Sequence, residues 1–339
     1  MNRAIRICAV WLMCFAWLSS LAMAQEAGDP FEIFAVLWRG ETEVEDGFRD
    51  YLDRRGIPYR LTIRNLNLDR GNAPGIVEEI NRVQPDLVYT WGTVTTSSII
   101  GKLETGTPEA YVREVPGVFV MVSYPLQSGI VATLENPGRP ATGVTFLPSV
   151  SAQLKTIETY GKFRNIAVIY EPNASNSRVN VEELQRDIRA FDMNLIELPV
   201  PLLDNGRPDP EQIPALIQSA KDQGADLLYM GPDSFLVSHA NAYTSEAIAA
   251  GLPTFASSQA PLKNSRAMFG LVTDYYTLGK LAGLQAERIL VGKQDSQDLP
   301  VAQLARYKLW INIDVVHEVG IYPPMKMISI ADFKTSPDR

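Results

Sequence analysis

The chain has 339 residues, 46% of them hydrophobic, which suits two lobes of ordinary domain size with a core each. Its formal net charge of −8 argues against nucleic acid or an anionic membrane surface as a partner, because both repel an acidic protein. Beyond the first 24 residues no apolar stretch is long enough to cross a bilayer, so we expect no direct membrane insertion of the mature chain.

Residues 1–24 have the three parts of a secretory signal peptide. Arg3 and Arg6 supply the positive start, residues 7–18 form an apolar run, and small residues flank a cleavage point after Ala24. The alternative is an uncleaved membrane anchor, but the run is shorter than the ~20 residues that a spanning helix needs. We therefore predict an exported protein whose signal peptide is cleaved after Ala24.

Both cysteines of the chain, Cys8 and Cys14, lie inside this segment. Neither follows the Leu-small-small triplet of a lipoprotein, so we expect a freely diffusing protein without a lipid anchor. The mature chain then contains no thiol and folds without disulfides.

Strand-like and helix-like segments alternate along the first part of the mature chain. Short apolar runs end in glycine, proline or polar residues, and amphipathic stretches with apolar residues at helical spacing follow them. The predicted strands are 31–38, 59–66, 86–91 and 117–122, and the predicted helices are 44–55, 76–83 and the segment after Gly92. This alternation is typical of parallel βαβ units.

The same pattern restarts after a predicted crossover at 142–148. The strands predicted here are 165–170, 195–200, 225–230 and 254–257, and the helices are 179–190, 213–223 and 243–249. A connection at 268–273, a helix at 275–290 and a strand at 307–313 follow, and periodicity alone assigns them to neither part. We expect an α/β protein with two doubly wound parallel-sheet lobes.

The sequence lacks the motifs of common catalytic and cofactor sites. It has no serine at a nucleophile elbow, no phosphate-binding Gly-Lys loop and no dinucleotide-type glycine triplet. His239 and His317 stand apart, and no cysteine remains after residue 24, so we expect no metal site. We expect a protein that is not an enzyme and needs no cofactor; a pair of cleft carboxylates acting as acid and base is the alternative.

Aromatic and hydroxyl side chains gather where the predicted strands end. In open α/β sheets, ligands bind beyond the carboxyl ends of the strands, where helices begin. Trp38, Trp91 and Tyr124 stand at such ends, where they either flank a ligand or belong to the core. Thr93 and Thr95 begin a predicted helix, whose free N–H groups favour a carboxylate; plain capping is the alternative.

Asp233 is the best-placed acid among these strand ends. It follows the strand predicted at 225–230 and precedes a helix, so it either pairs with a ligand ammonium group from an exposed position in the cleft or caps the helix. The helix that begins at Thr93 would bind an anion and Asp233 would bind a cation, so together they suit a zwitterionic ligand. The aromatic residues favour a large apolar or aromatic ligand side chain, whereas a sugar would require more polar partners.

Several short motifs occur in a fixed order along nearly the whole mature chain. They are Trp91-Gly92-Thr93, Gly129-Ile130-Val131, Thr142-Gly143-Val144, Ala167-Val168-Ile169-Tyr170 with Asn176-Ser177, Gly231-Pro232-Asp233-Ser234, Gly251-Leu252-Pro253-Thr254-Phe255-Ala256, Gly270-Leu271-Val272 with Tyr275, and Ile311-Asn312. Their order and spacing resemble the ABC-transporter substrate-binding family that includes tryptophan- and tyrosine-binding lipoproteins.

This resemblance implies a type I periplasmic-binding fold, with two lobes joined by three crossovers and a ligand in the cleft. It implies a first lobe of residues 31–147 plus 270–303 and a second lobe of residues 148–269 plus 304–339. It also implies a monomeric periplasmic protein that carries a small molecule, an amino acid, to an ABC permease in the inner membrane. A periplasmic sensor that presents the ligand to a membrane signalling receptor is the alternative.

The resemblance and the strand ends together suggest roles for individual side chains. Thr93 and Ser123 are expected to hold the ligand carboxylate, and Asp233 its ammonium group. Asn176 and Tyr275 are expected to add hydrogen bonds. The predicted site also includes Ser177. Family members often have an acidic residue just before the Asn-Ser pair, where this chain has Ser175, so the contacts from this segment stay open.

Overall fold

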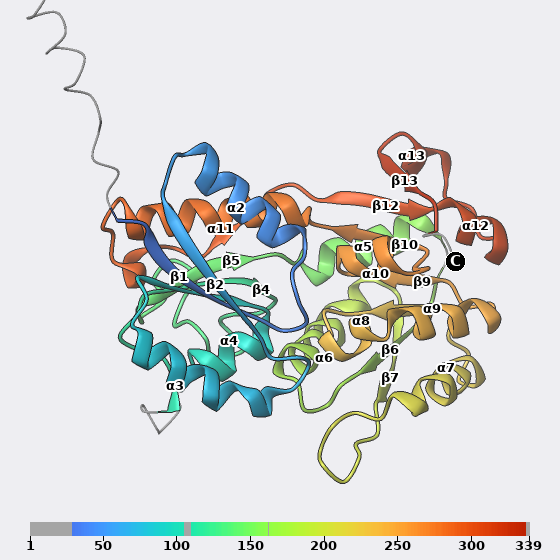
Figure 1. Cartoon of the computed structure of the whole chain (residues 1–339). Coiled ribbons are helices and arrows are strands. Elements are labelled where there is room, and N and C mark those ends of the chain that lie inside the picture. The colour runs from blue at the N-terminus through green and yellow to red at the C-terminus, as the bar shows by residue number, and fades with distance from the viewer. Residues whose placement is uncertain (1–28, 105–109, 162, 337–339) are drawn as a thin grey trace, which may run out of the picture.

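The structure is a computed structural model that describes residues 29–104, 110–161 and 163–336. The predicted signal peptide, with its cleavage point after Ala24, lies outside the described residues. The described chain forms two lobes that lie side by side, each a sheet with helices on both faces (Figure 1). Within the described ranges, none of the helices has both the length and the apolar composition that a bilayer crossing requires.

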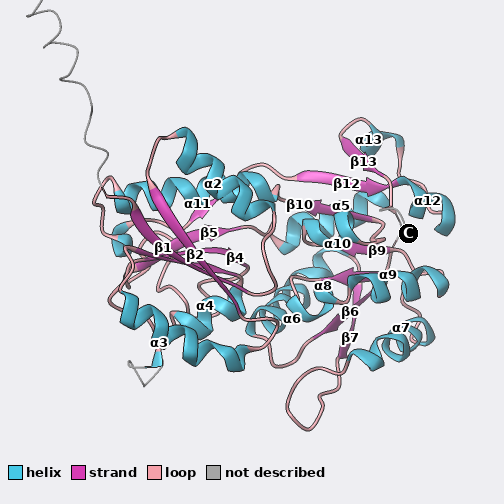
Figure 2. Ribbon diagram, viewed as in Figure 1, coloured by secondary structure: helices cyan, strands magenta, loops and turns pink. Residues whose placement is uncertain are grey.

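The first lobe is built on a six-stranded, all-parallel sheet in the order β11-β5-β4-β3-β1-β2. Its strands are β1 (Phe31–Leu37), β2 (Tyr59–Asn65), β3 (Leu87–Trp91), β4 (Gly117–Val122), β5 (Ala141–Thr145) and β11 (Ala302–Gln303). Helices α2 (Glu43–Arg54) and α11 (Tyr275–Leu290) cover one face, and α3 (Ala73–Val83) and α4 (Thr93–Ile99) cover the other (Figure 2).

Helices α2 and α11 come from opposite ends of the chain and touch through their backbones. A Cβ atom on Gly47 of α2 would lie 2.0 Å from the carbonyl oxygen of Tyr276, and one on Gly279 of α11 would lie 1.8 Å from that of Val44. Only glycine allows so close an approach. Phe48 and Leu278 are both buried in the core between these helices and the sheet. Helix α11 therefore completes the first lobe.

The second lobe is built on a seven-stranded sheet in the order β13-β12-β10-β9-β8-β6-β7. Its strands are β6 (Asn165–Tyr170), β7 (Asn194–Pro199), β8 (Leu227–Met230), β9 (Thr254–Ala256), β10 (Phe269–Val272), β12 (Lys308–Asn312) and β13 (Ala331–Lys334). Only the β10–β12 pairing is antiparallel. Its helices are α5 (Val150–Tyr160), α6 (Ser175–Asp187), α7 (Ile213–Asp222), α8 (Ser234–Ser238), α9 (Ala240–Ala249), α10 (Gln259–Asn264), α12 (Ile313–Val319) and α13 (Met325–Ile328).

The chain passes between the two sheets three times, after β5, after β10 and after β11. Two of these crossings are bonded together, since the Thr273 hydroxyl donates to the carbonyl oxygen of Phe146 at 2.9 Å. The predicted fold class, two doubly wound parallel-sheet lobes joined by three crossovers, is confirmed.

Several segments differ from the sequence prediction, and helix α5 and strands β11 and β13 were not predicted at all. Residues 269–272, expected to be a connection from which the first lobe continues at residue 270, form strand β10 of the second sheet. A four-residue apolar run does not show by its spacing alone whether it pairs with a sheet. Residues 142–145 of the predicted crossover belong to β5. Helix α6 begins at Ser175, four residues before the predicted start at residue 179. The prediction missed this first turn because it is polar and lacks the apolar spacing of a helix.

Candidate functional site

A small cavity of about 30 Å³ lies where strand ends of the two lobes meet. The residues that line it are Arg39, Trp91, Gly92, Thr93, Met121, Ser123, Phe146 and Tyr275 from the first lobe and its crossover, and Asn176, Pro232, Asp233, Ser234, Val237 and Ser258 from the second. A volume of this size holds roughly two water molecules. The two lobes therefore meet closely at this point.

Arg39 gives the cavity a positive charge that no anion balances. Its guanidinium carbon lies 5.1 Å from the ring centroid of Trp91, in a cation–π contact. Among the described residues its guanidinium makes no ion pair or hydrogen bond. Burial lowers the pKa of Arg39, with the charge of Tyr275 acting in the opposite direction, but an arginine keeps its charge at neutral pH. Sequence reasoning missed Arg39, although it follows the predicted strand end at Trp38.

Two buried polar atoms at this cavity have no hydrogen-bond partner within the described chain. They are the indole Nε1 of Trp91 and the side-chain carbonyl Oδ1 of Asn176. The amide nitrogen of Asn176 donates to the carbonyl oxygen of Pro232, so the orientation of the amide group is fixed. Buried polar groups in proteins are nearly always paired. The cavity therefore offers one donor and one acceptor in addition to Arg39.

A backbone irregularity in β4 shapes the first-lobe wall. Met121 has φ 57°, a left-handed conformation that is uncommon for a residue with a side chain. The β4–β5 register shifts between Phe119 and Val122, as in a β-bulge. Ser123 follows, and its backbone N–H donates to the hydroxyl of Thr93 at 3.3 Å. The bulge thus redirects the chain at the point where Met121 and Ser123 line the cavity.

Asp233 lines the cavity, but its carboxylate is occupied within the second lobe. Oδ1 accepts from the backbone N–H of Leu236 at 2.9 Å, and so caps α8. Oδ2 accepts from the backbone N–H of Glu171 at 2.7 Å and from the Ser177 hydroxyl at 2.8 Å. Burial raises the pKa of Asp233, and these hydrogen bonds oppose the shift. The expectation of an exposed acid is wrong, since Asp233 is only 2% exposed.

The structure brings together most of the residues that the sequence predicts for the site. Trp91, Thr93, Ser123, Asn176, Asp233 and Tyr275 line the small cavity. Trp38 lines a larger neighbouring cavity, Ser177 lies behind Asp233, and Thr95 is buried in α4 away from both cavities. Tyr124 also lines neither cavity, and instead reaches α6 of the second lobe.

The larger cavity has a volume of about 840 Å³ and adjoins the small one, because Ser234 lines both. Trp38 and Phe235 contribute aromatic walls from opposite lobes. Glu171 lies in its lining, directly after β6. Burial and the neighbouring charge of Asp233 raise the pKa of Glu171 to about 7, and the charge of Arg70 opposes this shift.

A third cavity, of about 420 Å³, also adjoins the small one, because Arg39 and Tyr275 line both. Across it, Glu43 of α2 pairs with Lys263 of α10 and accepts a hydrogen bond from Gln259 at 3.1 Å. The two lobes are thus joined by polar contacts at this edge of the cleft.

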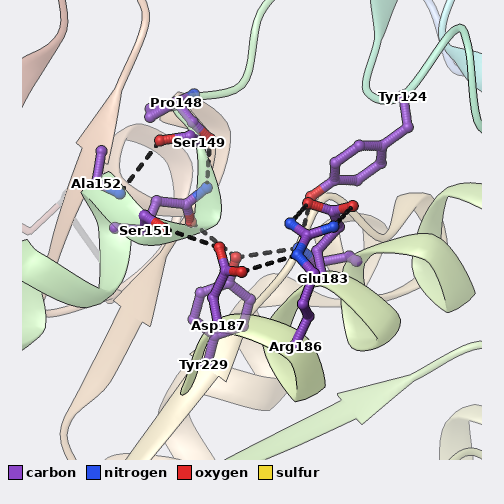
Figure 3. Close-up of polar contacts among 11 residues, drawn as sticks. Tyr124, Pro148, Ser149, Ser151, Ala152, Glu183, Arg186, Asp187 and Tyr229 are labelled. Atoms are coloured by element: carbon purple, nitrogen blue, oxygen red, sulfur yellow. Dashed lines mark hydrogen bonds and ion pairs between the residues drawn. The ribbon is translucent and has the colours of Figure 1, made fainter. Parts of the chain in front are cut away.

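A chain of hydrogen bonds, most of them buried, joins the lobes near the first crossover (Figure 3). Tyr124 of the first lobe accepts from Asn180 of α6, which also donates to Tyr229. Tyr229 donates to Gln153 of α5, and Gln153 donates to the carbonyl oxygen of Pro148 in the crossover. Figure 3 also shows Arg186 of α6 pairing with Glu183 and Asp187 beside this chain.

Two parallel-sheet lobes, three crossings and cavities lined from both lobes define a binding protein of the type I periplasmic-binding fold. The chain belongs to the family of ABC transporter substrate binding proteins, which matches residues 39–334. The resemblance seen in the sequence is confirmed. No group of histidine, cysteine and acidic side chains that could hold a metal ion occurs within the described residues.

Individual relatives agree with this family. A tyrosine-binding protein of Clostridioides difficile is 24% identical over 273 residues, which are 80% of this chain and 72% of the relative. The structure of an ABC domain in complex with L-Trp from Streptococcus pneumoniae has a TM-score of 0.76 at 19% identity, over 89% of this chain and 99% of the other. A conserved domain protein of Vibrio cholerae has a TM-score of 0.79 at 20% identity, over 90% and 99%.

Proposed function

We propose that this chain is the periplasmic substrate-binding protein of an ABC importer, and that it binds an amino acid between its lobes and delivers it to a permease in the inner membrane. The family and the names of the relatives support an amino-acid ligand. In this proposal the protein is exported through its signal peptide, works as a monomer and catalyses no reaction.

The observation that carries the proposal is the uncompensated charge of Arg39 at the junction of the lobes. A guanidinium without an anion is suited to a carboxylate, which it binds through two parallel hydrogen bonds. Thr93 and Ser123 stand on the same wall and can add hydroxyl contacts. The carbonyl oxygen of Asn176 faces the same space from the other lobe, where it can accept a hydrogen bond from the ligand ammonium group.

The adjoining cavity of about 840 Å³ is the space proposed for the ligand side chain. Trp38 and Phe235 give it aromatic walls, which favour an aromatic or large apolar side chain. The small cavity itself does not hold an amino acid, so we infer that the lobes separate to admit the ligand and close around it. A ligand that contacts both lobes shifts this equilibrium toward the closed form.

A binding panel tests the ligand class. Thermal-shift and calorimetric measurements should set tyrosine, tryptophan, phenylalanine and leucine against ribose, glucose and purine nucleosides. An amino acid is expected to stabilise the protein. Arg39→Gln should weaken its binding by about 1.5–3 kcal/mol, the scale of a hydrogen bond to a charged group. Arg60→Gln is the matched control, because Arg60 pairs with Glu32 at the surface of the same lobe. Stabilisation by a sugar or nucleoside alone would overturn the amino-acid assignment.

Export and transport have separate tests. Mass spectrometry of an osmotic-shock fraction should find a mature chain that begins at Gln25, and a full-length or lipid-modified species would contradict this. Deletion of the gene should abolish uptake of the labelled ligand. Normal uptake with a lost cellular response to the ligand would support the sensor alternative instead.

A further inference from the structure

Glu171 is a buried carboxylate without a hydrogen-bond donor. Its side chain is 10% exposed, and no hydrogen bond to its carboxylate occurs in the described part of the chain. Its opposite charge is Arg70 of the first lobe, with 3.8 Å between the guanidinium nitrogen and Oε1. Asp233 beside it accepts three hydrogen bonds. The two neighbouring acids therefore differ: Asp233 is satisfied by its own lobe, and Glu171 is not.

The charge of the Glu171 carboxylate is only partly compensated in this position. A buried charge is costly unless it is both paired and hydrogen-bonded. Arg70 meets only part of this requirement, because it belongs to the opposite lobe and its own side chain is 55% exposed. Glu171 would lose this partner whenever the lobes separate, and its charged form would then lack the counter-ion that Arg70 provides.

The other charged groups of the larger cavity are already engaged. Unlike Glu171, Asp69 accepts a hydrogen bond, from the backbone N–H of Gly71 at 2.8 Å, and Arg207 lies 3.9 Å from it across the lobes. His239 contacts the carbonyl oxygen of Phe235 through Nδ1 at 2.9 Å. Glu171 is left as the lining carboxylate that can accept a ligand group, and Trp38 and Phe235 stand in the same lining. Aromatic faces beside a carboxylate are a favourable environment for an ammonium group.

We propose that Glu171, and not Asp233, is the carboxylate that binds the ammonium group of the ligand. The inference rests on the proposed function, which it deepens by naming the residue for the ligand cation. An ammonium group has three N–H donors, so binding to Glu171 in the larger cavity leaves donors for the carbonyl oxygen of Asn176, which lines the adjoining small cavity. The ligand would displace Arg70 from Glu171, so Glu171 would pair either with the ligand or with Arg70 of the opposite lobe.

Three probes separate the two ends of the ligand in calorimetric titrations at pH 8. L-tyrosine has both charges, tyramine keeps the ammonium group alone, and N-acetyl-L-tyrosine keeps the carboxylate alone. Glu171→Gln should bind L-tyrosine and tyramine at least tenfold more weakly than wild type does. N-acetyl-L-tyrosine should bind wild type weakly, and the variant no worse. Glu197→Gln, on the exposed side of β7, is the matched control and should change nothing.

The pH dependence gives a second readout that a purely structural role would not produce. Because the pKa of Glu171 is about 7, its carboxylate forms as the pH rises from 6 to 8, and wild-type affinity for tyramine should rise with it. Glu171→Gln should bind tyramine equally at both values. Since Glu171 accepts no hydrogen bond in the fold, the variant should melt no earlier than wild type.

Each outcome decides the inference. It is overturned if Glu171→Gln binds L-tyrosine as tightly as wild type does, if N-acetyl-L-tyrosine binds wild type as tightly as L-tyrosine, or if wild type binds neither ammonium compound. A different result is expected if Glu171 binds an ammonium group but the ligand is not an amino acid. Wild type then binds tyramine but not L-tyrosine, and Glu171→Gln still loses tyramine.

Discussion

The side-chain nitrogen of Asn180 lies 2.8 Å from the phenol oxygen of Tyr124, and this hydrogen bond joins α6 of the second lobe to the loop after β4 of the first. Beyond Asn180 the buried chain continues through Tyr229 and Gln153 to the crossover at Pro148. Its other links lie within the second lobe and its crossover. Separation of the lobes therefore has to break the Asn180–Tyr124 bond, while the other links can remain.

Tyr124→Phe should weaken ligand binding by about 1 kcal/mol, the net contribution of one hydrogen bond, because only the closed form loses this bond. The amide nitrogen of Asn180 keeps Tyr229 as its acceptor, so no donor is stranded. Calorimetry with the ligand identified by the panel measures the change. Tyr322→Phe removes an exposed phenol whose oxygen contacts His317, and should leave affinity unaltered. Equal affinities for Tyr124→Phe and wild type would show that this bond does not favour closure.

Asp233→Asn should lower the free energy of unfolding by about 2–3 kcal/mol, since it weakens a helix cap and buried hydrogen bonds to a charged acceptor. Urea unfolding monitored by circular dichroism measures the change. Asp295→Asn is the control, because Asp295 caps a short helical turn at the surface and should cost much less. A fully stable Asp233→Asn protein that has lost ligand affinity would instead make Asp233 a ligand contact.

Glu171 should make the protein less stable as the pH rises from about 5 to 7. In the folded chain its pKa is raised from 4.5 to about 7, so over this range the folded state keeps a proton that the unfolded state releases. The free energy of unfolding should fall by about 2–3 kcal/mol across this interval, at 1.36 kcal/mol for each pKa unit. Urea unfolding at pH 5 and pH 7.5 should show this fall in wild type and in Glu197→Gln. A fall of the same size in Glu171→Gln would show that another group causes it.

Gly279→Ala should lower the free energy of unfolding by about 3 kcal/mol, the upper end for overpacking a tight core, because the new methyl group meets the backbone of α2. Gly75→Ala provides the opposite case in α3, where a Cβ atom has open space around it. It should raise the free energy of unfolding by about 0.5–1 kcal/mol, from helix propensity. Urea unfolding of both variants measures the contrast. Gly279→Ala with wild-type stability would show that the two helices can move apart freely.

Much of the fold could be predicted because apolar runs and amphipathic stretches alternate strongly. One amphipathic helix, α5, was missed although Val150, Leu154 and Ile157 have helical spacing. Other missed segments, β10, β11 and the start of α6, are short or polar. Strand β10 has four residues and β11 has two, and runs of this length pair with a sheet only because neighbouring strands are already in place. The polar first turn of α6 has no apolar period, so its start at Ser175 depends on packing that the sequence does not display.

Some residues of the candidate site could also be predicted from the sequence, and others could not. Thr93, Ser123 and Asn176 could be predicted because the ends of parallel strands converge in any such sheet. Arg39 and Glu171 were passed over, although both directly follow strand-end aromatic residues. They became candidates because, in the described structure, Arg39 has no anion beside it and the Glu171 carboxylate accepts no hydrogen bond. The sequence does not show which side chains find partners in the fold. Glu171 and Asp233 are two acids at strand ends that only the three-dimensional contacts distinguish.

The direct contact between α2 and α11 also means that the core of the first lobe depends on residues late in the chain. Val44 and Phe48 of α2 belong to the same buried cluster as Leu278 and Ala282 of α11, residues that come after most of the second lobe. A fragment ending at residue 147 would therefore leave these apolar side chains open to water and to other chains. Such long-range closure slows folding and prolongs exposure of unpaired surface. Each lobe also waits for a late strand, β11 in one and β12 in the other, so neither can mature before most of the polypeptide is present.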